Sequence, residues 1–144
     1  MTVVVDASVV AKWLLPEPGR DLALRLLDAQ VPLVSCDLLP VEVLAVLAKR
    51  HRRGELSLGH ARDAAGLLRE TMQVVELEPS AALLDAAFEL GLALRHAVYD
   101  CLYLACAQRR DAPLLTADGV LAGKAMALPI RVVTLAEVGR LLDA

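Results

Sequence analysis

Four acidic residues stand where carboxylates from distant parts of the chain could act together. They are Asp6, Glu42, Asp100 and Asp118. Asp6 directly follows the β-branched run 3–5, and Asp118 lies two residues beyond the apolar run 113–116. Both runs are typical of buried parallel strands, whose carboxyl ends share one edge of the sheet, where ligands bind. We therefore expect Asp6 and Asp118 to meet in one crevice, although each could instead simply cap the helix after its strand.

Glu42 and Asp100 lie in stretches that otherwise contain almost no charge. Glu42 is in the apolar segment 38–47, and Asp100 is the sole charge in 98–107. Neither segment has an obvious polar face, so both carboxylates are predicted to be at least partly buried. Burying an unpaired carboxylate costs several kcal/mol, and no lysine or arginine adjoins either residue. A divalent metal shared among the acidic residues would remove this difficulty.

A site built only from carboxylate oxygens favours Mg²⁺ or Mn²⁺ over zinc. Such a metal lowers the pKa of bound water and neutralises charge on a phosphate, so the four acids indicate phosphodiester hydrolysis. Ser8 and Thr116, each two residues from one of the aspartates, are placed to orient a carboxylate or to hold a water on the metal. Their alternative is a plain turn or cap hydroxyl. His96, four residues before Asp100, is assigned to packing or capping and left out of the site.

The bulk composition is apolar and mildly acidic. Hydrophobic residues make up 57% of the chain, and the mean hydropathy is +0.53; this suits helices packed on a buried sheet, or an apolar surface reserved for a partner. The net charge of −3 does not favour nucleic-acid binding, and 3% aromatic residues disfavour a base-stacking platform. The basic cluster 49–53 fits a helix C-terminus and phosphate steering equally well.

Short apolar strands alternate with helical segments along the chain. The predicted strands are 3–5, 31–35, 74–77, 113–116 and 130–133. The predicted helices are 8–15, 20–29, one from an Asp37 cap to 53, 57–72, one from a Ser80 cap to 94, 99–109, and one after Thr134. This alternation predicts a single α/β domain, residues 1–144, with a mainly parallel sheet flanked by helices. No segment reads as membrane-spanning, and three cysteines without a CxxC pair indicate a reducing cytoplasm.

The segments around the four acids resemble the motifs of PIN-domain nucleases. These segments are Val4–Ser8, Pro40–Val43, Tyr99–Ala105 and Leu115–Asp118. Their order and rough spacing agree with the family over essentially the whole chain, and the nearest resemblance is to VapC-type toxins of toxin–antitoxin pairs. One departure is Ala45, where many members of the family carry a polar residue, often Asn.

The resemblance implies a three-layer PIN-like fold and a Mg²⁺- or Mn²⁺-dependent endoribonuclease. It also implies a homodimer silenced by a small VapB-like antitoxin. Carried over by position, Asp6, Asp100 and Asp118 would be metal ligands, and Glu42 would bind directly or through water. Ser8 and Thr116 match frequent hydroxyl positions. The resemblance does not name the RNA that is cut.

Other functions fit the sequence less well. A phosphatase of the haloacid dehalogenase type needs a second aspartate where Ser8 stands, and a phosphoacceptor receiver domain needs paired acids at the first strand and a lysine after a late strand. The remaining alternative is a catalytically silent PIN-like module that binds a protein partner or RNA. Retention of all four acids argues against it, and stabilisation by added metal would discriminate the two.

Overall fold

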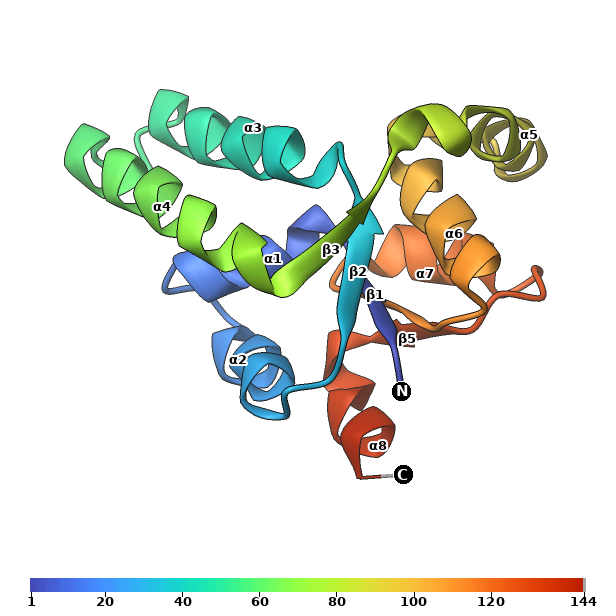
Figure 1. The fold of residues 1–144 in the computed structure, drawn as a ribbon. Coiled ribbons are helices and arrows are strands. Elements are labelled where there is room, and N and C mark those ends of the chain that lie inside the picture. The colour runs from blue at the N-terminus through green and yellow to red at the C-terminus, as the bar shows by residue number, and fades with distance from the viewer. Residues whose placement is uncertain (144) are drawn as a thin grey trace.

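A five-stranded parallel sheet forms the centre of the computed structural model, which describes residues 1–143 (Figure 1). The strands are β1 (Val3–Val5), β2 (Leu33–Cys36), β3 (Val75–Glu78), β4 (Leu114–Thr116) and β5 (Val132–Thr134). Their order in the sheet is β3-β2-β1-β4-β5, and every neighbouring pair is parallel. The predicted α/β class with a mainly parallel sheet is therefore confirmed.

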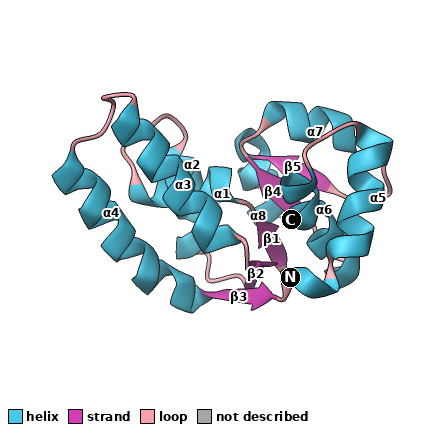
Figure 2. Cartoon of the chain, turned by 90° about the horizontal axis from the view of Figure 1, so that it is seen from above, coloured by secondary structure: helices cyan, strands magenta, loops and turns pink. Residues whose placement is uncertain are grey.

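Helices cover both faces of this sheet. They are α1 (Ala7–Leu14), α2 (Arg20–Asp28), α3 (Leu39–Arg52), α4 (Leu58–Thr71), α5 (Leu84–Leu94), α6 (Val98–Arg110), α7 (Gly119–Ala125) and α8 (Val138–Leu142). Helices α1 to α4 lie on one side, and α5, α6 and α7 lie on the other, as the view from above shows (Figure 2). The molecule thus has three layers, and α8 returns to pack against α2.

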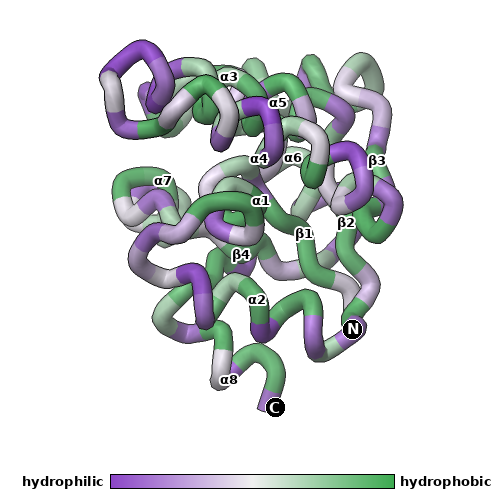
Figure 3. The backbone as a smooth tube through the Cα atoms, turned by 90° about the vertical axis from the view of Figure 1, so that its left-hand side faces the viewer, coloured by the Kyte–Doolittle hydropathy of each residue, from purple (hydrophilic) through white to green (hydrophobic). Residues whose placement is uncertain are grey.

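The core is densest around β1 and α6. Val3, Val4 and Val5 are wholly buried, and α6 is buried from Cys101 to Ala107 because it lies across β1, β2 and β4. The hydropathy tube accordingly runs green through the central strands (Figure 3). A strand covered on both faces needs a continuous apolar run rather than an alternating one, which is the pattern of residues 3–5.

The order in which strands are added to the sheet reverses between β1 and β4. From β1 the chain adds β2 and β3 on one side, and it then crosses over to add β4 and β5 on the other. Val5 pairs with Leu115, so Asp6 and Thr116 come next to each other at the carboxyl edge. This is the switch point at which open parallel sheets bind ligands.

The sequence-predicted elements differ from the structure in several places. Helix α7 is not among the predicted elements; it is short and rich in glycine and alanine, and it carries little apolar periodicity. Asp37 does not cap α3, as predicted, because its carboxylate accepts the backbone N–H of Ser80 at 3.0 Å. Ser80 in turn opens a short 3₁₀ turn, and α5 begins only at Leu84. Among residues 1–143, no helix combines the length and apolar character needed to cross a membrane.

Candidate active site

A cavity of about 470 Å³ opens between α3 and α6, over the carboxyl ends of β1 and β4. All four predicted acidic residues line it, and Ser8 and Lys49 line it as well. The acids come from four separate places: the ends of β1 and β4 and the first turns of α3 and α6. The fold therefore gathers residues that lie more than a hundred positions apart in the chain.

Asp6 is the most enclosed of the four acids, with only 4% of its surface exposed. One carboxylate oxygen accepts the Ser8 hydroxyl at 2.5 Å and the Val9 backbone N–H at 3.2 Å, which makes Asp6 the N-cap of α1. The other oxygen accepts the Thr116 hydroxyl. Burial raises the pKa of the Asp6 carboxyl to about 6, although these hydrogen bonds oppose the change. Three donors leave room for a further ligand, because a carboxylate has about four acceptor positions.

Asp118 caps α7 with one oxygen. Its Oδ1 accepts the backbone N–H groups of Val120 and Leu121, at 3.0 and 3.1 Å. Its own N–H donates to the Thr116 hydroxyl at 3.0 Å, so Thr116 links Asp118 to Asp6. The cap and the cavity-lining roles thus coexist, since Oδ2 takes no part in the cap.

Glu42 is half-buried in the first turn of α3, where the Tyr103 hydroxyl donates to it. Burial raises the pKa of Glu42, and the charges of Asp100 and Asp6 add to this effect. Burial likewise raises the pKa of Tyr103, so this phenol stays protonated and remains a donor. Sequence reasoning missed Tyr103, although a tyrosine inside an apolar helix needs a partner for its hydroxyl.

Asp100 is partly exposed and pairs with His96, whose Nε2 lies 2.7 Å from Asp100 Oδ2. His96 was predicted to be a packing or capping residue outside the site. The structure instead places it against a site carboxylate. The available signal was the four-residue spacing to Asp100, although His96 lies in the turn before α6 and not on the helix itself.

The structure brings three of these side chains closest together. Each of His96, Asp100 and Asp118 offers one atom that could bind a metal ion, and these three atoms lie within 4.8 Å of one another. Asp6 and Glu42 line the same cavity but do not belong to this tight group. Among the residues lining the cavity, Lys49 is the one full cation opposite four carboxylates. A cluster of oxygen donors with so little positive charge fits a hard divalent cation.

The prediction that Glu42 and Asp100 are partly buried is confirmed. For α3, however, the absence of a polar face does not mean that the helix is buried on all sides. Part of its apolar surface faces solvent, because Val41 and Leu44 are 60% and 44% exposed. Only Leu39, Val43 and Leu47 face the core. By contrast, α6 is buried as its sequence indicates.

Comparison with known proteins agrees with this architecture. Residues 3–125 match the family model described as the PIN domain. Over 128 residues the chain is 36% identical to Ribonuclease VapC3 of Pyrobaculum aerophilum, covering 89% of this chain and 98% of that protein.

Solved structures show the same fold at lower identity. VapC20 of Mycobacterium tuberculosis, described as a toxin that cleaves the sarcin-ricin loop, superposes with a TM-score of 0.64 at 21% identity, over 84% of this chain and 94% of that one. A toxin–antitoxin complex from Klebsiella pneumoniae gives a TM-score of 0.67 at 16% identity, over 92% and 97%. The chain therefore belongs to the PIN-domain family, within which it is a relative of the VapC ribonucleases.

Proposed function

We propose that this protein is a metal-dependent endoribonuclease that hydrolyses phosphodiester bonds of RNA. The observation that carries the proposal is the cavity at the sheet's switch point, which is lined by all four acidic residues of the family's motifs. The 36% identity to a VapC ribonuclease supports the same activity. We take residues 1–144 as one nuclease domain.

We propose Mg²⁺ or Mn²⁺ as the cofactor. Asp6, Asp100 and Asp118 would hold the ion, with Glu42 binding directly or through water. When bound, such an ion supplies Lewis acidity and positive charge at the scissile phosphate. The donor set supports this assignment, because the cavity offers carboxylate oxygens and little other charge.

The chain's own residues hold this site ready before substrate arrives. Ser8 and Thr116 fix both oxygens of Asp6, Tyr103 fixes Glu42, and the first turn of α7 fixes one oxygen of Asp118. Donors that are already in place need no reorganisation during the reaction. Lys49 at the cavity wall is placed to contact a phosphate of the RNA backbone.

We propose further that the protein is the toxin of a type II toxin–antitoxin pair, acts as a homodimer, and is bound by a small VapB-like antitoxin. The toxin–antitoxin complex among its structural neighbours supports an antitoxin partner. Exposed apolar side chains, including Val41, Phe88 and Leu92, offer surface for such contacts. The three cysteines are free and buried, which suits a reducing compartment such as the cytoplasm.

The test is cleavage of a mixed RNA pool by the purified protein in Mg²⁺, in Mn²⁺ and in EDTA, with thermal melting under the same conditions. We expect cleavage only with metal, and a higher melting temperature with metal because the ion binds the folded state. Cleavage that persists in EDTA would contradict metal dependence. A protein that neither cuts nor is stabilised by either metal would be a silent binding module.

A further inference from the structure

His96 contacts both Asp100 of the acidic cavity and Lys124 of α7. Its Nε2 lies 2.7 Å from Asp100 Oδ2, and its Nδ1 lies 3.1 Å from the Nζ of Lys124 on α7. The His96 side chain is only 10% exposed, whereas that of Asp100 is 27% exposed. The imidazole is therefore more enclosed than the carboxylate that it contacts.

These contacts fix which ring nitrogen carries the proton. A lysine ammonium donates hydrogen bonds and accepts none, so Nδ1 of His96 must be the acceptor. The neutral ring then carries its hydrogen on Nε2, and this N–H donates to Asp100. An Nε2 that carries a hydrogen cannot at the same time bind a metal ion.

The backbone of the turn that carries His96 is fixed by several contacts. Lys124 Nζ also donates to the carbonyl of Arg95 at 3.0 Å. Arg95 has φ of 51°, an unusual conformation for a residue with a side chain. A Cβ added at Gly91 would lie 3.2 Å from the His96 carbonyl oxygen, so the end of α5 closely approaches this turn. The turn between α5 and α6 is therefore packed into a defined position, and His96 with it.

We propose that His96 is a positioning residue that holds Asp100 in the orientation that binds the divalent cation, and that Lys124 holds His96 in the required tautomer. Asp100 approaches Asp118 closely, and like charges repel, so without a donor Asp100 would turn toward solvent. Asp118 caps α7, and Lys124 lies on the same helix. Helix α7 therefore positions Asp118 directly and also fixes His96, the hydrogen-bond partner of Asp100. This inference rests on the proposed metal site.

The first test is Mn²⁺ affinity, measured by calorimetry on the whole chain without RNA. His96→Ala should weaken binding by about 10-fold to 100-fold, the usual effect of removing a donor that orients a metal ligand. His96→Gln should restore most of the affinity, because its amide N–H can occupy the place of Nε2. His60→Ala, at an exposed histidine of α4, is the matched control and should bind as the wild type does.

The second test is the nitrogen spectrum of the histidine rings in the metal-free protein. His96 should show the neutral tautomer protonated at Nε2. Lys124→Met should convert His96 to a mixture of tautomers and weaken Mn²⁺ binding less than His96→Ala does. Circular dichroism melting of each variant establishes that it is folded.

The outcomes separate this inference from the proposed function. If the wild type binds no Mn²⁺, the proposed metal site fails and the role of His96 fails with it. If the wild type binds Mn²⁺ and His96→Ala binds equally well, the metal site stands and the positioning role is overturned. A proton on Nδ1, or a glutamine variant as weak as the alanine variant, would also overturn it.

Discussion

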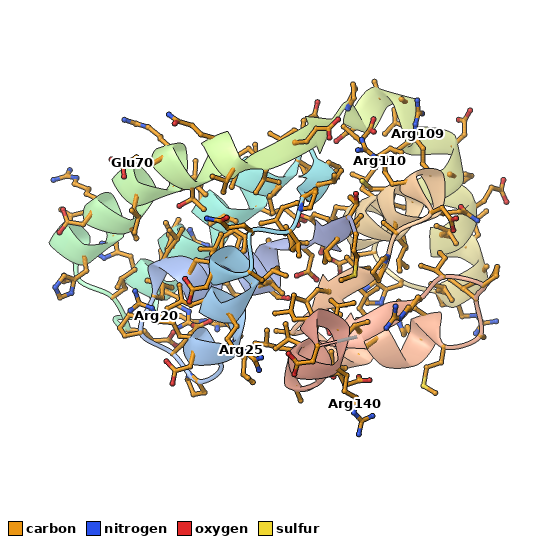
Figure 4. The ribbon with its side chains drawn as sticks, turned by 60° about the horizontal axis from the view of Figure 1, so that its bottom comes forward. Arg20, Arg25, Glu70, Arg109, Arg110 and Arg140 are labelled. Carbon is orange, nitrogen blue, oxygen red and sulfur yellow. The ribbon has the colours of Figure 1, made fainter. Side chains whose placement is uncertain are left out.

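Neutral donors surround the carboxylates of the cavity. Hydroxyl groups of Ser8, Thr116 and Tyr103 and backbone N–H groups supply most of the hydrogen bonds to them. Such donors orient a carboxylate without cancelling its charge, whereas an arginine would satisfy the acid and leave little attraction for a metal. The arginines with carboxylate partners lie outside the cavity lining. One of them is Arg110, which is labelled at the end of α6 in Figure 4 and pairs with Glu76 and Glu78 of β3.

Tyr103 provides a direct test of this arrangement. Tyr103→Phe removes the donor to Glu42 and leaves the ring in place, so the half-buried carboxylate loses its partner. We expect about 1–3 kcal/mol less free energy of unfolding, measured by urea denaturation, because a buried acceptor is left unsatisfied. The cleavage rate should fall by about tenfold, as for other partners of metal ligands.

Tyr99→Phe serves as the stability control, because Tyr99 is 57% exposed on the same helix. Its hydroxyl should contribute little to the free energy of unfolding. If Tyr103→Phe is as stable and as active as the wild type, Glu42 does not depend on this hydrogen bond.

Among the structural elements, α3 carries the basic cluster 49–53 at its end, and two residues of this cluster have different contacts. Arg50 pairs with Glu17, whereas Lys49 lines the acidic cavity. Arg52 is exposed and is not among the residues that line the cavity. The sequence left helix-end stabilisation and phosphate steering equally open for residues 49–53, and the structure favours a phosphate contact for Lys49 alone.

Lys49→Ala should therefore weaken binding of single-stranded RNA and make it less sensitive to salt. Loss of one phosphate contact lowers the slope of log K against log salt concentration by about 0.7. Fluorescence anisotropy would measure this on an Asp100→Asn background, which should leave the RNA uncut. Arg52→Ala on the same background should keep the full slope. Equal slopes for all three proteins would rule out the Lys49 contact.

The capping box before α8 gives a pH-dependent contribution to stability. The Thr134 hydroxyl and backbone N–H donate to Glu137 at 2.7 and 3.2 Å, and these bonds hold the pKa of Glu137 below its ordinary value of 4.5. A carboxyl with a lowered native pKa stabilises the fold fully above its unfolded pKa, and this stabilisation disappears as the pH falls through the native value.

Glu137→Ala should thus lower the melting temperature at pH 7, and the difference from the wild type should shrink as the pH falls below 4.5. Glu137→Gln can accept the same hydrogen bonds but does not titrate, so it should lose less at pH 7. Melting curves at several pH values check this. A difference that stays constant down to pH 3 would contradict the role of the charge.

The elements that sequence predicted well are those with strong local patterns. The β-branched run of β1 and the Ser57 cap of α4 are visible without any tertiary contact. Helix α7 was missed because its short sequence carries no clear apolar face, and the Asp37 cap was wrong because a long-range bond to Ser80 competes for the same carboxylate.

Across the whole molecule, the order of the parallel strands explains why the acidic cavity was predictable, whereas the supports supplied by Tyr103 and Lys124 were not. Two acids that follow β1 and β4 must share an edge, so their meeting needs only the topology. The contacts of Tyr103 with Glu42 and of Lys124 with His96 depend on how α3, α6 and α7 pack, which no local pattern encodes.

Single-turnover cleavage by Asp100→Asn is the measurement that decides whether this acidic cavity cuts RNA. The control is Asp63→Asn, at an exposed aspartate of α4 away from the cavity. Both proteins would be assayed with Mg²⁺ and with Mn²⁺ after their folding is confirmed by circular dichroism. We predict cleavage by the wild type and by Asp63→Asn, and a loss of at least about a hundredfold in Asp100→Asn, comparable to removing one group that stabilises the transition state. Cleavage by Asp100→Asn at the wild-type rate would show that this acidic cavity does not cut the RNA.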